Sequence, residues 1–123
     1  MKNVIAIFVL CMISFSANAQ LAGTKWKGKV NIPNSTEVIF DFKTDVADVV
    51  TTTGMPVESC SYTIKSDTIT FKKLKGGSPC PVSSMFTVQF SVKDNQMNII
   101  PLTDDCEGRK DTFTREAFIK IKD

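Results

Sequence analysis

Apolar and polar residues alternate with a period of two through most of the chain after residue 20. Side chains on a β-strand point alternately to opposite faces, so this period predicts strands with one buried face. We find no helical stripe of apolar residues three and four positions apart in the same region. The pattern predicts eight strands, at residues 24–32, 37–43, 47–53, 58–65, 68–74, 85–92, 96–102 and 112–121.

Short turn-forming segments separate these strands. Examples are Gly54-Met55-Pro56, Ser66-Asp67 and Lys93-Asp94-Asn95. Turn chemistry at such short intervals is typical of antiparallel hairpins that follow one another along the chain. Eight short strands with one apolar face each predict a closed, all-β, up-and-down barrel, which leaves no free sheet edge. A sandwich of two sheets is the alternative.

The alternation also predicts which side chains fill the barrel, because every second residue of a strand faces the interior. The first strand contains the only tryptophan, Trp26, and its other face carries Lys25, Lys27 and Lys29, which we expect in water. The predicted inward residues are Thr24, Trp26, Gly28, Val30, Ile32, Val38, Phe40, Phe42, Cys60, Tyr62, Ile64, Ile69, Phe71, Phe86, Val88, Phe90, Val92, Phe113, Arg115, Ala117, Ile119 and Ile121.

The first residues have the form of a secretory signal. Lys2 precedes an apolar run at residues 4–13, and an A-x-A motif ends at Ala19. The run is too short to span a bilayer. We therefore predict a signal peptide over residues 1–19 and a single barrel domain over residues 20–123.

Charge and composition narrow the classes of partner. Lys2 leaves with the signal, which reduces 15 basic residues to 14 against 13 acidic ones. The lysines are spread over several segments, so nothing indicates nucleic-acid binding. No long apolar segment follows the signal. We expect a secreted or periplasmic protein with no nucleic-acid partner and no membrane insertion, and the oligomeric state stays open.

The residues available for catalysis are few. The chain has no histidine, which removes Ser-His, Cys-His and His-metal arrangements. Asp104, Asp105, Glu107 and Asp111 share a loop with Arg109, but their spacing matches no calcium-binding loop. We interpret this loop as a solvated turn with salt bridges. The sequence thus predicts no enzymatic activity, no cofactor and no metal site.

Three cysteines, Cys60, Cys80 and Cys106, follow the signal. In a hairpin that turns at Asp94, the numbers of facing residues sum to about 188, and 80 and 106 sum to 186. We therefore predict a disulfide between Cys80 and Cys106, with Cys60 as a buried thiol. A bond between Cys60 and Cys80 is the alternative.

Two stretches of the sequence resemble a known protein family. Residues 21–28, LAGTKWKG, resemble the start of small bacterial lipocalin-like proteins of the calycin group, although the spacing here is G-x-x-W rather than G-x-W. Residues 113–120, FTREAFIK, resemble the last strand of lipocalins and fatty-acid-binding proteins. The resemblance implies an eight-stranded barrel plugged at one end by Trp26, with Arg115 laid against the tryptophan ring.

Two further details refine the resemblance. The run that ends at Arg109 has the D-x-C-x-x-R form seen in secreted lipocalin-like barrels. Fatty-acid-binding proteins place a tyrosine two residues after their inward arginine, where this chain has Ala117. Capture of a carboxylate by an Arg/Tyr pair is therefore not implied.

The function that the resemblance implies is binding of a small hydrophobic ligand. Because the plug at Trp26 is structural, we expect a ligand toward the opposite mouth, near the inward residues Phe42, Tyr62 or Phe90. The alternative is a barrel packed by its own aromatic rings that acts through its surface, as an inhibitor, envelope or adhesion module.

Overall fold

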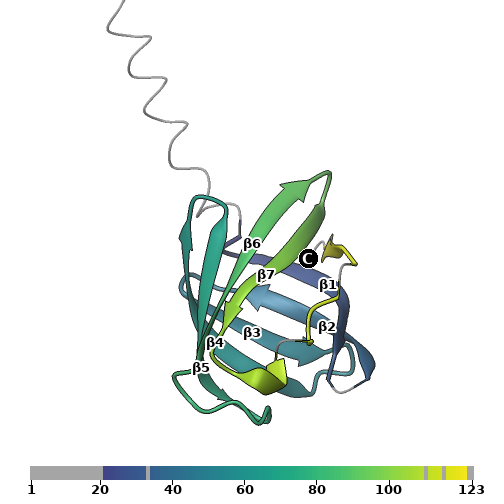
Figure 1. Cartoon of the computed structure of the whole chain (residues 1–123). Helices are drawn as coiled ribbons and strands as arrows, with labels where there is room; N and C mark the ends of the chain where they lie inside the picture. Colours follow the sequence, from purple (N-terminus) through teal and green to yellow (C-terminus); the bar gives the residue numbers. More distant parts are fainter. Residues whose placement is uncertain (1–20, 33, 110, 115, 122–123) are drawn as a thin grey trace, which may run out of the picture.

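The protein is a closed antiparallel barrel of eight strands in chain order, β1 to β8 (Figure 1). In this computed structural model the described residues are 21–32, 34–109, 111–114 and 116–121, so the predicted signal peptide lies outside them. The up-and-down barrel is confirmed, and the sandwich is not favoured. The elements are β1 (Thr24–Asn31), β2 (Ser35–Phe42), β3 (Val46–Thr51), β4 (Pro56–Lys65), β5 (Thr68–Gly76), β6 (Met85–Lys93), β7 (Gln96–Asp104), the 3-10 turn η1 (Glu107–Arg109) and β8 (Phe118–Ile121).

The up-and-down order gives the barrel two different ends. The connections that follow β1, β3, β5 and β7 lie at one end, and those that follow β2, β4 and β6 lie at the other. Tight turns close the second group: Asp94 and Asn95 both have positive φ, at 53° and 62°, between the paired residues Lys93 and Gln96. Two successive positive-φ residues are the geometry of a type I′ hairpin turn, whose twist matches that of its strands.

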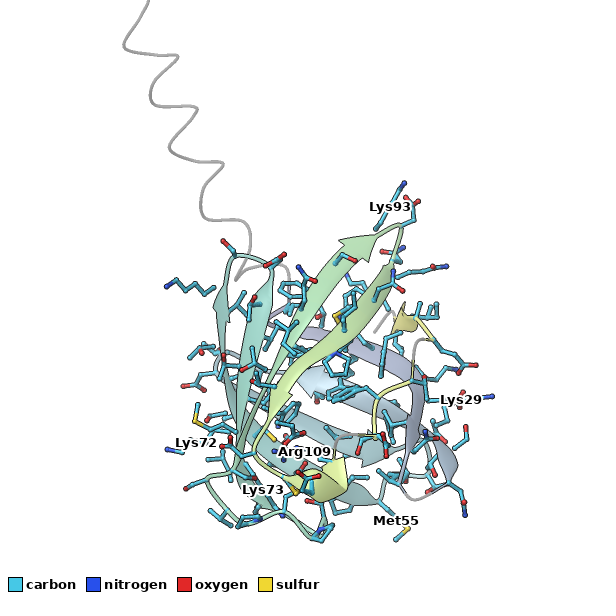
Figure 2. The ribbon with its side chains drawn as sticks, in the orientation of Figure 1. Lys29, Met55, Lys72, Lys73, Lys93 and Arg109 are labelled. Atoms are coloured by element: carbon cyan, nitrogen blue, oxygen red, sulfur yellow. A yellow bond between two sulfur atoms is a disulfide. The ribbon has the colours of Figure 1, made fainter. Side chains whose placement is uncertain are left out.

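The predicted inward phase is confirmed for most of β1 to β6. Trp26 is 1% exposed, and its indole Nε1 donates a hydrogen bond of 2.8 Å to Thr24 Oγ1. Lys25, Lys27 and Lys29 are exposed on the other face of β1. Figure 2 shows Lys29 pointing away from the barrel. The buried inward residues include Val30, Val38, Phe40, Phe42, Cys60, Tyr62, Ile69, Phe71, Phe86, Val88 and Phe90.

Inward predictions near the end of the chain are wrong, including that of Ile121, which pairs with the exposed Lys25. Val92 is 36% exposed, because it lies near the tip of the β6–β7 hairpin, which projects beyond the other strands (Figure 1). Ile119 is 45% exposed, whereas its neighbour Phe118 is 1% exposed and belongs to the core.

A register shift explains the reversed phase of β8. Phe113 forms an isolated bridge with Val30, whereas Lys27 pairs with Ile119 further along the same two segments. In an antiparallel pair without irregularity the two residue numbers keep a constant sum; here the sum rises from 143 to 146. An odd shift moves every later side chain to the other face. The predicted strand 112–121 is therefore only Phe118–Ile121 as a regular strand.

The barrel closes along a short seam. β8 pairs with β7 at two positions, Gln96 with Ile119 and Met97 with Phe118, and with β1 at residues 25–27. The β6–β7 ladder, in contrast, extends from Lys93 to Phe86. The pairings of β8 with its two neighbours are therefore the shortest in the barrel.

Candidate functional site

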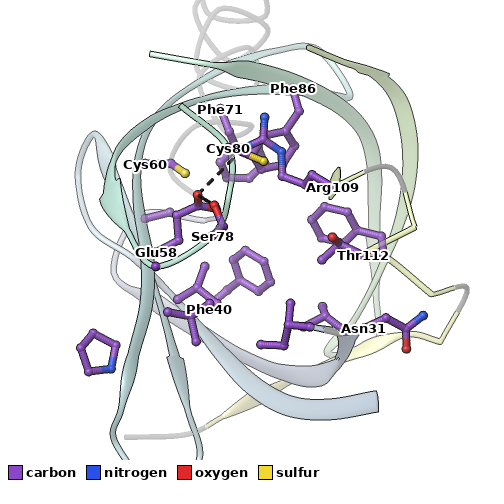
Figure 3. Close-up of a pocket in the computed structure, with 18 of the residues that line it drawn as sticks. Asn31, Phe40, Glu58, Cys60, Phe71, Ser78, Cys80, Phe86, Arg109 and Thr112 are labelled. Carbon is purple, nitrogen blue, oxygen red and sulfur yellow. Dashed lines mark hydrogen bonds and ion pairs between the residues drawn. The ribbon is translucent and has the colours of Figure 1, made fainter. Parts of the chain in front are cut away.

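A cavity of about 510 Å³ occupies one end of the barrel (Figure 3). On β1 the lining begins at Val30, the second inward-facing position after Trp26. It continues into the connections at the same end of the barrel. Met55, Gly77 and Thr112 belong to those connections and line the cavity too. The cavity therefore opens at the end that carries the connections after β1, β3, β5 and β7.

Four aromatic rings that line this space contact one another in a closed cycle. Phe71 and Phe86 are stacked with centroids 4.7 Å apart, and Phe86 lies 5.9 Å from Phe113. The cycle continues from Phe113 to Phe40 at 6.2 Å and from Phe40 back to Phe71 at 6.5 Å. All four rings line the cavity. The phenylalanines thus form walls here, and the wall is continued by aliphatic side chains such as Val49.

The three predicted ligand residues lie in the packed interior. Phe42 is completely buried, and Tyr62 and Phe90 are each 7% exposed. The Phe42 and Tyr62 rings meet edge to face at 5.2 Å, and the Tyr62 hydroxyl donates a hydrogen bond to the Lys43 carbonyl. None of the three lines the cavity, whose aromatic wall is made of other inward rings.

A buried ion pair lies at the mouth end of the cavity. Lys73 is 3% exposed, and its ammonium lies 3.5 Å from Glu58 Oε1. Lys73 Nζ also donates hydrogen bonds to the carbonyl oxygens of Ser78, at 3.0 Å, and Cys80, at 2.6 Å. The Ser78 hydroxyl donates to Glu58 Oε1 at 2.7 Å. The N–H donors of the Lys73 ammonium therefore have acceptors within the protein. A buried charge needs such partners to offset the loss of water.

Arg109 approaches the same cluster from η1. Its side chain is 5% exposed, and Nε and Nη2 each lie 2.9 Å from a different oxygen of Asp104. The guanidinium carbon lies 4.2 Å from the centre of the Phe86 ring. The loop that we interpreted as a solvated turn is thus salt-bridged, but its arginine is buried. Figure 2 shows Lys73 and Arg109 inside this end of the barrel and Lys72 outside it.

One nitrogen of Arg109 has no hydrogen-bond acceptor among the described residues. That nitrogen, Nη1, is buried and lies 4.0 Å from Glu58 Oε1, which is ion-pair distance but too long for a hydrogen bond. Arg109 and Glu58 both line the cavity, from opposite sides of the view in Figure 3. A mainly apolar cavity wall therefore includes one residue, Arg109, that has an unmatched donor.

The predicted disulfide between Cys80 and Cys106 is confirmed, with Cα atoms 5.6 Å apart. It joins the β5–β6 connection, which supplies the Cys80 carbonyl to Lys73, to the segment that begins η1 and carries Arg109. The disulfide thus holds both buried cations in one place. A structural disulfide also fits an oxidising compartment.

Cys60 is the free, buried thiol that we predicted, and it lines the cavity. Burial, reinforced by the nearby Glu58 carboxylate, raises the pKa of the Cys60 thiol to about 12. The thiolate is the nucleophilic form of cysteine. At neutral pH Cys60 is therefore a small apolar wall residue.

Trp26 and Arg115 were predicted to form the plug. Trp26 is buried at the end opposite the cavity, but Arg115 lies outside the described residues. The cation–ring contact that involves the described residues is that of Arg109 with Phe86. Within the described residues there is also no group of three metal-binding side chains, and no helix long and apolar enough to cross a bilayer.

The chain matches no known protein family, no curated protein and no solved structure in the comparisons made. The eight-stranded antiparallel barrel is consistent with a lipocalin-like fold. Membership of the calycin group stays a prediction from the three sequence stretches.

Sequence reasoning missed the buried charges. Glu58 and Lys73 have the same parity as the inward Cys60 and Phe71, so the alternation already placed them inside. Arg109 is different, because no strand period reaches η1. Only the spacing of three residues from Cys106 connects it to the barrel end.

Proposed function

We propose that this protein binds a small, largely apolar molecule in the cavity at the mouth end of the barrel. The observation that carries the proposal is a cavity of about 510 Å³ that opens at one end of the barrel and is lined by four phenylalanine rings. Ligand sites are commonly about 300 to 1,000 Å³ in volume and lined mainly by apolar side chains with a few polar groups. An eight-stranded barrel has an interior suited to one small ligand.

The packed-barrel alternative needs its aromatic residues to fill the interior. Phe40, Phe71, Phe86 and Phe113 instead border open space, while Phe42 and Phe90 lie deeper. This arrangement favours ligand binding over a barrel that acts only through its surface as an inhibitor, envelope or adhesion module.

Binding without catalysis is part of the proposal. The full sequence contains no histidine, and burial raises the pKa of the thiol that lines the cavity. General bases and nucleophiles work best with a pKa near the working pH. The apolar walls and the charges already paired at the mouth support a carrier or sequestering role.

A secreted or periplasmic location completes the proposal. It is supported by the signal-like pattern of residues 1–19 and by the disulfide between Cys80 and Cys106. Cleavage after Ala19 is the expected processing step, which N-terminal sequencing of protein from its own host would identify.

Ligand binding can be tested with N-phenylnaphthylamine, a neutral apolar dye whose emission rises in apolar sites. The wild type should bind the dye, and Val49→Phe, which adds volume at the cavity wall, should weaken binding by about tenfold or more. Ile100→Phe is the matched control, because Ile100 is 57% exposed on the outer face of β7. No binding by the wild type, or equal weakening by both variants, would overturn the proposal. If the wild type binds the dye, native mass spectrometry of protein from its own host would identify the resident molecule.

A further inference from the structure

Arg109 is one of the residues that line the cavity, and its Nη1 is a buried nitrogen without an acceptor. The guanidinium is fixed on two sides, by Asp104 through Nε and Nη2 and by the ring of Phe86 below it. Nη1 is the remaining part of the group, and no described residue accepts a hydrogen bond from it. A buried donor without an acceptor costs free energy, so a molecule in the cavity that supplies an acceptor gains affinity.

The charges around Nη1 restrict the kind of acceptor. The buried cluster among the described residues has two cations, Lys73 and Arg109, and two carboxylates, Glu58 and Asp104. The positive charge of Arg109 is already met by Asp104 at 2.9 Å. A second anion at Nη1 would lie beside Glu58, whose Oε1 is 4.0 Å from that nitrogen. Like charges at such a distance in a poorly hydrated site repel one another.

A neutral oxygen avoids this repulsion. A carbonyl oxygen accepts the hydrogen bond from Nη1 and adds no charge to the cluster. A hydroxyl does the same and can also donate to Glu58 Oε1, since that oxygen and Nη1 are separated by 4.0 Å. The cavity wall is mainly apolar, so a single polar atom in the ligand is enough to meet this donor.

We propose that the molecule bound in the barrel carries a neutral acceptor oxygen, a carbonyl or hydroxyl, that bonds to Arg109 Nη1, and that the site discriminates against a carboxylate. This inference rests on the proposed function, because it names the ligand chemistry of the same cavity. It assigns Glu58 the role of excluding anions from the donor of Arg109.

Three probes of equal chain length test the inference through displacement of N-phenylnaphthylamine: decane, methyl octyl ketone and decanoic acid. In the wild type at neutral pH the ketone should bind more tightly than decanoate by about tenfold or more. Tighter binding of decanoate than of the ketone would overturn the choice of a neutral acceptor.

The hydrogen bond itself is tested by the ratio of ketone affinity to decane affinity. Comparing this ratio between the wild type and a variant cancels the different hydration of the ketone and the alkane. The double variant Asp104→Asn with Arg109→Met removes the donor and its partner together, so no buried charge is left alone. The ratio of ketone affinity to decane affinity should fall by about tenfold. An unchanged ratio would overturn the inference and leave the apolar cavity as a ligand site.

The role of Glu58 has a test that leaves Arg109 in place. Glu58→Gln should raise decanoate affinity by about tenfold and change ketone affinity by less than about twofold. Lys72→Gln is the control, because Lys72 is exposed, next to Lys73 in sequence and on the outer face (Figure 2); it should alter no ratio. Failure of decane and ketone alike to displace the dye would instead contradict the proposed function, whereas equal decanoate affinity in wild type and Glu58→Gln would contradict this inference alone.

Discussion

The ring of Phe118 lies directly against Gly28. A Cβ atom built at residue 28 would come within 2.6 Å of Phe118 Cδ2 and 2.8 Å of Cγ and Cε2, far inside normal contact distance. The absence of a side chain at residue 28 therefore provides the space in which the last strand inserts its ring into the core.

Gly28→Ala should destabilise the barrel by about 1 to 3 kcal/mol, the range for overpacking a filled core. Denaturant unfolding followed by circular dichroism measures the loss. Gly77→Ala is the control, because nothing lies within 4 Å of its added methyl group. The combined variant Gly28→Ala with Phe118→Leu should lose less than the sum of the two single changes, since the smaller side chain relieves the clash. Strict additivity would contradict this packing.

Trp26→Ala should destabilise the fold by about 3 to 5 kcal/mol, because it deletes a large side chain that is 1% exposed. Changing Lys25, Lys27 or Lys29 to Gln should each cost well under about 1 kcal/mol, as exposed substitutions usually do. Tryptophan emission of the folded wild type should be blue-shifted and protected from aqueous quenchers. A quencher-accessible Trp26 would show that the opposite face of β1 is the buried one.

Loss of the disulfide should weaken both the fold and the mouth. For a sequence separation of 26 the loop-entropy relation gives about 3.5 kcal/mol for the bond between Cys80 and Cys106. Replacing both cysteines by serine should lower the unfolding free energy by roughly this amount and reduce dye binding, because the bond anchors the connections around Lys73 and Arg109. Non-reducing peptide mapping provides the direct check, and a Cys60–Cys80 peptide would rule out the assignment.

The raised pKa of the Cys60 thiol predicts that the folded protein loses stability at alkaline pH. Its pKa is raised to about 12 in the folded state from an ordinary value of 9.0. The full stabilisation is present below the ordinary value; as pH rises above it, the unfolded chain loses the thiol proton first, and stability declines until the folded pKa is reached. Cys60→Val should flatten this part of the stability curve between pH 9 and pH 11, as measured by denaturant unfolding at each pH. In folded wild type at pH 8, Cys60 should resist alkylation by iodoacetamide; rapid modification would contradict its burial.

The barrel could be predicted from the sequence because apolar and polar residues alternate along its strands. The alternation through Trp26, Phe40 and Phe71 is uninterrupted, and polar turns mark where each strand ends. The pairing of Cys80 with Cys106 also followed, since a hairpin converts sequence position into spatial position.

What the sequence could not supply depends on tertiary contacts. The inward face of β8 depends on three additional residues between two contacts with β1, and no local pattern records such a shift. The cavity could not be predicted either, because alternation says which rings point inward but not how much of the interior they fill. The burial of Arg109 depends on Asp104, Phe86 and the disulfide acting together.

The short seam between β7, β8 and β1 also bears on how the molecule folds. Each earlier hairpin can form from neighbouring residues, whereas closure must bring residues 25–27 to residues 119–121. Contacts between such distant segments form slowly, because the entropy of closing a long loop is lost before they provide any stabilisation. Until that step, the unfinished meander has two unpaired edges, and unpaired edges recruit other chains. We therefore expect the encounter of the first and last strands to limit the refolding rate and to set the protein concentration above which refolding yields aggregates.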